Sequence, residues 1–272
     1  MAQWQDGYVQ ANGIRIHYTR TGGDKPPVVL CHGSTDSGLC WTPVARALEA
    51  DYDVVMPDAR GHGLSDAPDG GYDHATRADD LAAFIQALGL DRPVVGGHSM
   101  GASQTLAFAA AYPDALRAAI LEDGGIRMPG WNPPNRGAPD AALRLKEMTR
   151  EQLIAFARER HPTWAEEELG PWADAKLQVS LKHVNAPRSQ LDFRELLPKV
   201  TVPILLITSD PERGGGVTPE AAEEAKRIHP DTTVVRLSPA GHNVRREQFA
   251  GFVEAVRAFL RQHAGAAPAP AR

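Results

Sequence analysis

The sequence predicts an α/β protein in which a mostly parallel, twisted sheet of about eight strands is flanked by helices and interrupted by one helical insertion. Short apolar runs alternate with longer segments of helical periodicity in the first and last parts of the chain. The apolar runs are nearly continuous, which is typical of strands that are buried on both faces. The alternation stops between residues 124 and 199 and then resumes.

The first part of the chain opens on a predicted hairpin and then repeats strand and helix. An Asn-Gly pair at positions 12–13 separates two strand-like runs, 8–10 and 14–19, and this dipeptide favours a tight hairpin turn. Further strands are expected at 28–31, 53–56, 93–97 and 119–121. Helices are expected at 41–49, 77–88 and 102–111.

Residues 124–199 are expected to form a helical cap over a core made of residues 1–123 and 200–264. This segment has few strand signals and holds three of the five tryptophans. Its helices are expected near 141–148, 150–160 and 171–183. After it, strands are expected at 204–207 and 233–237, and helices at 219–228 and 246–263. The Ala-, Pro- and Gly-rich residues 265–272 are expected to be a disordered tail.

Composition narrows the class of protein. The chain has 272 residues, with 42% hydrophobic and 23% charged, which is typical of a soluble globular protein. A net charge of −5 argues against nucleic acid or anionic membrane as a partner. No apolar run approaches the ~20 residues of a membrane span, and the N-terminus lacks the basic and apolar regions of a signal peptide, so a cytoplasmic location is expected. Cys31 and Cys40 have no metal-ligand spacing and are expected to be reduced and buried.

A G-x-S-x-G motif at residues 97–101 lies between a predicted strand and a predicted helix. In that context the serine lies on a sharp, strained turn that presents its hydroxyl, and the flanking glycines allow the turn to be tight. The motif therefore predicts Ser99 as a nucleophile, against the alternative of an ordinary turn with an incidental serine. The backbone N–H of Met100, the next residue, is the expected first donor of an oxyanion hole.

Three further motifs occur in a fixed order around this one. His-Gly-Ser at 32–34 follows the third predicted strand, an Asp-Ala-Arg-Gly-His-Gly-Leu-Ser segment at 58–65 follows the fourth, and Gly-His-Asn at 241–243 follows the last. With these motifs the chain resembles an α/β-hydrolase over its whole length except the tail. The resemblance implies that His242 is the base for Ser99 and that the backbone N–H of Ser34 is the second oxyanion donor, with Gly33 allowing close approach. The 58–65 segment is expected to brace its own loop.

The carboxylate that orients His242 has competing candidates. Most of the family places this acid after the seventh strand, where the chain has Asp210 two residues early and Glu212 at the expected position. Branches such as the zearalenone lactonases and haloalkane dehalogenases carry it after the sixth strand, 24 residues beyond the nucleophile. Asp123 has that offset, so it is preferred, with Asp210 as the main alternative and Glu212 as the third.

The sequence and the resemblance together predict a serine hydrolase that cleaves a small, largely apolar ester or lactone through an acyl-enzyme. No metal cluster, phosphate loop or dinucleotide motif occurs, so no cofactor is expected. Trp131, Trp164 and Gly33 are candidates for the pocket wall, and packing between cap and core is the alternative for the tryptophans. Hydrolysis of a C–C bond in a diketone, cofactor-free haloperoxidase or perhydrolase activity, and a non-catalytic small-molecule receptor remain alternatives. A small molecule is the expected partner, with a homo-oligomer left open.

Overall fold

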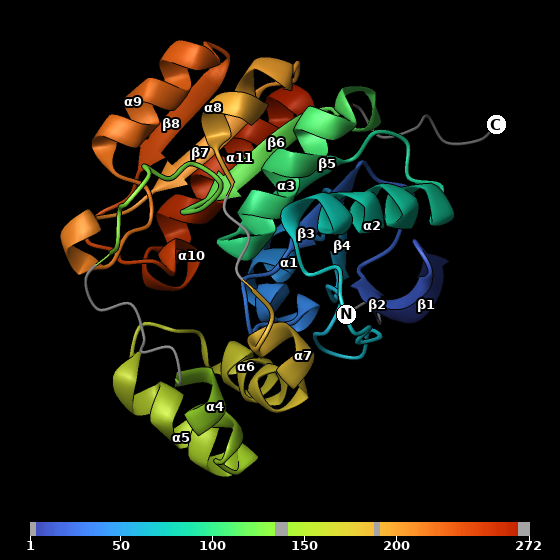
Figure 1. Cartoon of the computed structure of the whole chain (residues 1–272), viewed down its shortest axis with the longest axis vertical. Helices are drawn as coiled ribbons and strands as arrows, with labels where there is room; N and C mark the ends of the chain where they lie inside the picture. Colours follow the sequence, from blue (N-terminus) through green and yellow to red (C-terminus); the bar gives the residue numbers. More distant parts are fainter. Residues whose placement is uncertain (1–3, 134–140, 188–190, 266–272) are drawn as a thin grey trace.

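The computed structural model describes residues 4–133, 141–187 and 191–265, which form a twisted eight-stranded sheet with helices on both faces (Figure 1). The strand order is β1-β2-β4-β3-β5-β6-β7-β8. β1 (Gln5–Ala11) pairs antiparallel with β2 (Ile14–Arg20), and β2 pairs antiparallel with β4 (Asp53–Pro57). All further pairs are parallel. The predicted fold class is therefore confirmed.

The remaining strands match the predicted apolar runs to within one or two residues at each end. They are β3 (Pro27–Cys31), β5 (Val94–His98), β6 (Ala118–Glu122), β7 (Ile204–Thr208) and β8 (Thr232–Arg236). Every residue of β4, β5, β6 and β7 is buried, which explains why these segments show no polar alternation.

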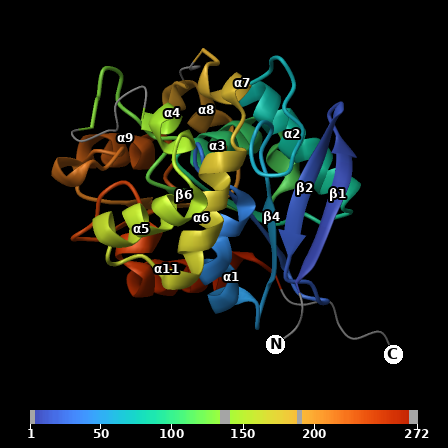
Figure 2. The ribbon, with the colours of Figure 1, turned by 90° about the horizontal axis from the view of Figure 1, so that it is seen from below.

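The hairpin of β1 and β2 forms one edge of the sheet and of the molecule (Figure 2). Its turn has positive φ at both central residues, 47° at Asn12 and 77° at Gly13. That geometry is the reason for the Asn-Gly pair, because few other dipeptides adopt it without strain.

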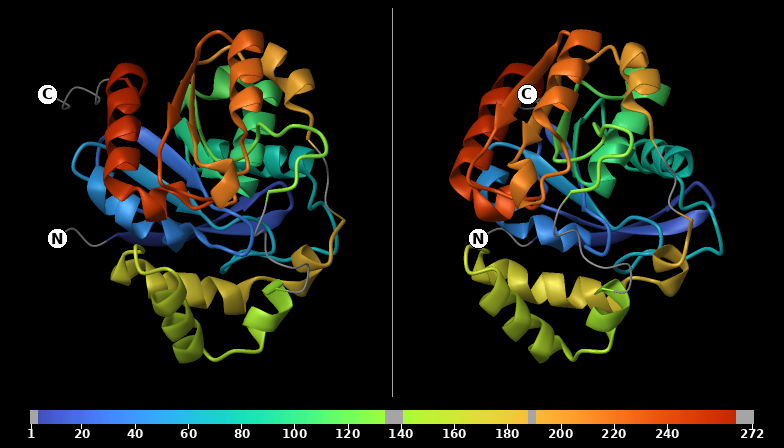
Figure 3. Two further views of the ribbon diagram at one scale, coloured as in Figure 1. Left: turned by 90° about the vertical axis from the view of Figure 1, so that its left-hand side faces the viewer. Right: turned by 60° about the vertical axis from the view of Figure 1, so that its left-hand side comes forward.

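Helices cover the two faces of the sheet (Figure 3), and a cluster of buried apolar side chains lies between the sheet and the helices on each face. On one face pack α1 (Thr42–Leu48) and α11 (Phe249–His263). On the other pack α2 (His74–Ala87), α3 (Met100–Ala111), α8 (Phe193–Leu196) and α9 (Pro219–Ile228). Neighbouring strand residues alternate between the two clusters: Val28 and Val54 face the first, whereas Val29 and Val55 face the second.

Between β6 and α8 the described residues, 123–133, 141–187 and 191–192, form four inserted helices, which lie in a separate layer (Figure 3). They are α4 (Ala141–Lys146), α5 (Arg150–Arg160), α6 (Glu166–Gln178) and α7 (Leu181–Val184). Their apolar side chains, with Cys40, form a third cluster of their own. The layer covers the carboxyl ends of the strands, since Lys176 donates to the carbonyl oxygen of Thr35 after β3 and the Ser180 N–H donates to that of Gly61 after β4.

Two helix predictions are wrong in their boundaries. In place of one helix near 171–183 the structure has α6 and α7, and α6 carries Pro171 inside. It begins at Glu166, where three consecutive glutamates favour a helix start. The predicted helix at 246–263 is two helices, α10 (Val244–Glu247) and α11, because the backbone of Gln248 leaves the helical region with φ −129° and ψ 53°.

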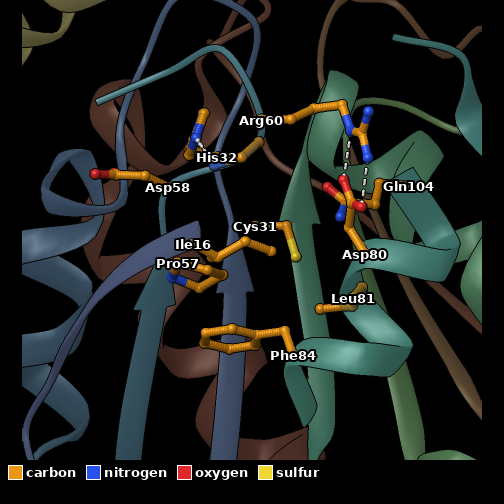
Figure 4. A pocket seen from close by; sticks show the side chains of 11 residues that line it. Ile16, Cys31, His32, Pro57, Asp58, Arg60, Asp80, Leu81, Phe84 and Gln104 are labelled. Atoms are coloured by element: carbon orange, nitrogen blue, oxygen red, sulfur yellow. Dashed lines mark hydrogen bonds and ion pairs between the residues drawn. The ribbon is translucent and has the colours of Figure 1, made fainter. Parts of the chain in front are cut away.

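The 58–65 segment braces the loop after β4, as its sequence predicts. The Arg60 guanidinium donates to both carboxylate oxygens of Asp80 at 2.5 Å, a pair drawn in Figure 4. Asp58 accepts the backbone N–H groups of Gly38 at 2.7 Å and Leu64 at 2.9 Å. The cavity beneath this loop (Figure 4) has a volume of about 20 Å³, which accommodates about one water-sized sphere and no substrate.

Two expectations concern the ends of the chain and the membrane. Of the tail predicted at 265–272, residues 266–272 lie outside the described part of the structure. Every helix among residues 4–133, 141–187 and 191–265 is too short or too polar to cross a lipid bilayer.

Candidate active site

Ser99 lies at the sharp turn between β5 and α3. Its φ of 52° and ψ of −107° are rarely adopted by a residue with a side chain, so the surrounding structure must enforce them. Two glycines allow this close packing: a Cβ at Gly97 would lie 2.3 Å from the Gly101 carbonyl carbon, and one at Gly101 would lie 2.1 Å from the Cys31 carbonyl oxygen. The turn presents the serine side chain at the carboxyl edge of the sheet.

Three side chains from distant parts of the chain meet at this edge. The Ser99 hydroxyl donates to His242 Nε2 at 2.8 Å, and the His242 Nδ1–H donates to Asp123 Oδ2 at 2.7 Å. The two bonds require a single imidazole tautomer, with the proton on Nδ1 and the lone pair on Nε2. The His242 side chain is 37% exposed and that of Asp123 is 0% exposed, so the acid is shielded while the base is open to a small molecule.

The Asp123 carboxylate is held by more than the histidine. It follows β6 directly, with a positive φ of 42° that turns its side chain toward the loop after β7. There it accepts the backbone N–H groups of Gly216 at 2.7 Å and Val217 at 3.2 Å. Three N–H donors thus fix the position of the carboxylate beside the imidazole. The glycine-rich segment 214–216 supplies one of them.

Neither of the other two acid candidates contacts His242. The Asp210 carboxylate accepts from Arg236 Nη2 at 2.7 Å, from the Ser238 hydroxyl at 2.8 Å and from a backbone N–H at 3.2 Å. Glu212 is 71% exposed and lies 4.0 Å from Arg236. Asp210 therefore braces the loop between β8 and His242, and the structure brings Asp123 alone of the three to the imidazole.

The residues expected to form an oxyanion hole lie on adjacent elements. β3 and β5 are paired, with Cys31 opposite Gly97, so the loop after β3 and the turn at Ser99 leave the same edge side by side. Met100 is the first residue of α3, where a backbone N–H has no partner within the helix. Ser34 is exposed in the loop after β3, and Gly33 before it lies against His98, whose Nδ1 would be 2.6 Å from a Cβ.

His98 has a role that the sequence did not predict. Its ring packs against that of His242, tilted by 47°, at a centroid distance of 4.8 Å. Its Nε2–H donates to the His242 carbonyl oxygen at 2.9 Å. Burial and the nearby Arg245 hold the pKa of His98 well below its usual range, so it is a neutral support for the base.

The family is decided by the match of residues 28–255 to the model of the Alpha/beta hydrolase family. This chain belongs to the α/β-hydrolase family. It is 32% identical over 262 residues to N-formylmaleamate deformylase of Pseudomonas putida, which covers 93% of this chain and 96% of that relative. It is 26% identical over 243 residues to 2-(acetamidomethylene)succinate hydrolase of Mesorhizobium japonicum, covering 83% of this chain and 84% of the relative.

Solved structures agree with this assignment. A crystal structure of N-formylmaleamic acid deformylase from Pseudomonas putida superposes with a TM-score of 0.81 at 29% identity, covering 93% of this α/β-hydrolase and 100% of that chain. A crystal structure of an esterase from Rhodococcus superposes with a TM-score of 0.75 at 25% identity, covering 96% and 99% of the two chains. The protein is therefore a hydrolase of this family.

The two cysteine thiols of the α/β-hydrolase are not reactive groups of this site. Cys31 and Cys40 are free and buried, as predicted, and burial raises the pKa of each thiol to about 12. Neither is a nucleophile at neutral pH, because a thiol reacts as the thiolate. Over the described ranges, no three His, Cys, Asp or Glu side chains are grouped so that they could hold a metal ion.

The two tryptophans predicted for the pocket wall, Trp131 and Trp164, differ from each other in burial and in contacts. Trp164 is 8% exposed, stacks on His161 at 4.1 Å and lies beneath the Arg246 guanidinium at 4.4 Å, so it packs the inserted helices onto α10. Trp131 is half-buried, and its indole N–H donates to the Gly215 carbonyl oxygen at 3.3 Å. For Trp164 the packing alternative therefore describes the observed contacts.

Beneath the inserted helices the α/β-hydrolase buries six charged side chains, which we call the buried ion cluster: Asp36, Glu122, Glu168, Lys176, Arg245 and Arg246. Each is at most 5% exposed. Asp36 receives Lys176 Nζ at 2.7 Å and Arg246 Nη2 at 2.9 Å, Glu122 receives Arg245 Nη1 at 3.2 Å, and Glu168 pairs with Arg246. The cluster joins α6, the loop after β3, the end of β6 and α10, so it ties the inserted helices to the segments that carry Asp123 and His242.

Replacing Asp36 with asparagine should lower the free energy of unfolding by about 3–5 kcal/mol, because it leaves two buried cations without their shared anion. Burial alone would raise the pKa of Asp36, but Arg246 and Lys176 hold it well below the ordinary value of 3.8. The stabilisation is therefore fully present above pH 3.8 and is lost as the pH falls through the lower folded value. Urea unfolding at neutral and acidic pH measures both effects.

The matched control is Asp174→Asn on α6, the helix that carries Lys176, where it breaks an exposed ion pair with Arg150 of 2.6 Å. Exposed pairs contribute little to stability, so this variant should unfold close to the wild type. Equal unfolding free energies for the two variants would show that the cluster does not stabilise the fold.

Proposed function

We propose that this hydrolase cleaves a carboxylic ester or lactone of a small, largely apolar substrate through an acyl-enzyme on Ser99. The observation that carries the proposal is the unbroken hydrogen-bond chain from the Ser99 hydroxyl through His242 to the buried Asp123. A serine hydroxyl is a weak nucleophile unless an adjacent base removes its proton. In this hydrogen-bond chain the base is His242, which is within hydrogen-bond distance of the Ser99 hydroxyl.

In the first half of the reaction, Ser99 Oγ attacks the substrate carbonyl carbon while His242 Nε2 accepts the hydroxyl proton. The carbonyl oxygen becomes an oxyanion, which the backbone N–H groups of Ser34 and Met100 stabilise. Collapse of this intermediate breaks the bond to the leaving oxygen, which takes the proton from His242. The products of this half are an alcohol and an ester of Ser99.

In the second half, water attacks the acyl-enzyme while His242 Nε2 accepts one of its protons. A second oxyanion forms in the same hole and collapses, and the proton returns to Ser99 Oγ as the carboxylic acid leaves. Asp123 keeps the proton of the neutral imidazole on Nδ1 and stabilises the imidazolium that forms in both halves. Its three N–H donors hold the carboxylate in the position from which it orients the imidazole.

An acylated nitrogen in place of the ester oxygen is the second candidate substrate. It is favoured by the 32% identity with N-formylmaleamate deformylase over 93% of this chain. Ser99, His242 and Asp123 would have the same roles in this reaction. One requirement is added: the leaving nitrogen must receive its proton from His242 before the C–N bond breaks. The deformylase and the 26% identical 2-(acetamidomethylene)succinate hydrolase are both named for substrates that contain a carboxylate as well as an acylated nitrogen.

One experiment tests the proposal and separates the candidates. The purified protein is assayed against p-nitrophenyl esters, lactones, a diketone, N-formylmaleamate and 2-(acetamidomethylene)succinate, with and without prior labelling by a fluorophosphonate. Turnover of an ester or lactone that the label abolishes is the expected result. Turnover restricted to the two N-acyl compounds favours the second candidate. Failure to label and to turn over any member refutes a serine hydrolase and favours a binding protein.

A further inference from the structure

The hydroxyl of Ser34 is the end of a second hydrogen-bond chain, separate from that of Ser99. Its Oγ lies 3.0 Å from Nε2 of His183, and Nδ1 of the same imidazole lies 3.1 Å from Nη2 of Arg77. The three residues come from different elements: Ser34 from the loop after β3, His183 from α7 and Arg77 from α2. One of the inserted helices therefore reaches the loop that the proposed mechanism uses for its oxyanion hole.

The chemistry of arginine fixes the direction of this chain. A guanidinium has only donors, so Nδ1 of His183 accepts its hydrogen bond and carries no proton. The ring proton is then on Nε2, which donates to Ser34 Oγ. Because the serine oxygen accepts this bond, its own hydrogen remains to be donated, and no acceptor for it is found in residues 4–133, 141–187 and 191–265.

Arg77 is placed in a costly environment for its charge. It is 4% exposed, and no ion pair links it to a carboxylate in the described part of the chain. Burial is the main reason that the pKa of Arg77 falls to about 10, a value at which the guanidinium is still charged at neutral pH. A buried cation that points at an imidazole polarises the ring N–H and, through it, the Ser34 hydroxyl.

The ring of His183 is held in place on two sides. It packs against the ring of His62 at a centroid distance of 4.2 Å and against that of Tyr72 at 5.7 Å. The helix α7 is also fixed to the loop after β4 by the bond from the Ser180 N–H to the Gly61 carbonyl oxygen at 2.8 Å. These contacts orient the imidazole toward Ser34 before any substrate binds.

We propose that the Ser34 hydroxyl is a third donor to the substrate oxyanion, and that His183 and Arg77 are the positioning residues that direct it. The inference rests on the proposed function, since it places the oxyanion at the backbone N–H of the same residue. The hydroxyl and the N–H of one serine are only a few ångströms apart, so an oxygen that is bound by the N–H lies beside the hydroxyl. Ser34 is an exposed residue whose hydroxyl has a hydrogen to donate, and the bond from His183 restrains the position of this hydroxyl.

The test measures kcat and KM for a substrate that the protein turns over. It also measures the rate constant for labelling of Ser99 by a fluorophosphonate, because the phosphoryl oxygen of this reagent gains negative charge at the oxyanion position. Ser34→Ala keeps the backbone N–H and removes the hydroxyl. We expect a loss of about 10-fold or more in kcat and in labelling rate, with KM and the melting temperature little changed. Ser34→Thr, which keeps a hydroxyl, is the matched control and should retain more activity than the alanine variant.

A double-mutant cycle distinguishes positioning from structural support. His183→Ala should lower kcat by a similar factor when Ser34 is present and should cause little further loss in the Ser34→Ala background. His183→Gln, whose side-chain amide can still donate to Ser34, should recover part of the activity. These results together support the positioning role.

Two outcomes overturn the inference and leave the proposed function standing. The first is a Ser34→Ala variant with wild-type kcat and labelling rate. The second is a His183→Ala variant that loses the same factor in both backgrounds, which would mean that His183 acts by docking α7. A wild-type protein that the fluorophosphonate does not label refutes the serine mechanism itself, and the third donor with it.

Discussion

Replacing Ser99 with alanine should lower kcat by on the order of 10³ or more while the protein stays folded. Alanine removes the oxygen that attacks the carbonyl and donates to His242 Nε2 at 2.8 Å. It keeps a Cβ of the same size, so the strained backbone at φ 52° is no more strained than before. The measurement is kcat for a substrate found in the panel, with the melting temperature as the check on folding.

Ser103→Ala is the matched control for this variant. Ser103 is one turn along α3, and its hydroxyl donates to the Ser99 carbonyl oxygen at 3.3 Å, so the change removes a nearby serine without touching His242. We expect it to keep most of the activity. Substantial turnover by a purified Ser99→Ala sample would rule out the acyl-enzyme mechanism.

Asp123→Asn should cost about 10⁴ in kcat, by analogy with the corresponding change in a serine protease. An asparagine NH₂ facing His242 donates to Nδ1, which moves the ring proton to Nε2 and leaves no lone pair for the Ser99 hydroxyl. In the wild type the N–H groups of Gly216 and Val217 donate to the Asp123 carboxylate; in the variant they face an amide instead. The kcat value and the melting temperature separate the loss of the tautomer from a loss of folding.

Asp210→Asn is the comparison that decides the acid. It removes the charge that holds Arg236 and the Ser238 hydroxyl, so it should affect stability more than kcat. An inactive Asp210→Asn protein together with an active Asp123→Asn protein would show that the contact between Asp123 and His242 does not operate in catalysis.

The sheet was predictable because its strands are marked by their composition. Strands such as β5 and β7 are buried along their whole length and therefore read as short apolar runs between helical segments. The serine elbow was predictable for a related reason, since its backbone leaves room only for glycine at positions 97 and 101. Both features depend on the types of residues that are consecutive in the sequence.

The preference for Asp123 over Asp210 came from an offset supplied by the family resemblance, because the residues around the two acids do not distinguish them. Each follows a strand in the parallel sheet, and β6 and β7 are neighbours, so both acids leave the same edge one strand apart. The difference is in the direction of the side chains, which depends on the φ of 42° at Asp123 and on the contacts that hold Asp210 to Arg236. The 24-residue offset favours Asp123, but neither this φ nor these contacts can be derived from the spacing.

The hydrogen bonds that link Ser34, His183 and Arg77 could not be predicted for another reason. Arg77 lies on a helix that is otherwise an ordinary cover for the sheet, and His183 is 149 residues from Ser34. A charged residue on a predicted helix is usually solvated, so its burial is visible only once α7 is seen to pack over it. The same holds for Lys176 and Arg246, whose partners are separated by more than 70 residues.

The buried ion cluster bears on how such a protein can diversify. The two members on α6, Glu168 and Lys176, cancel each other in charge, yet each is paired across the boundary with a residue of the sheet or its loops. An α6 that lacked Glu168 and Lys176 would leave Asp36 and Arg246 facing an unmatched surface. Exchange of this helix for one without both residues is thus penalised even between proteins of the same fold. Substitutions on the exposed faces of the inserted helices leave the pairing across the boundary intact.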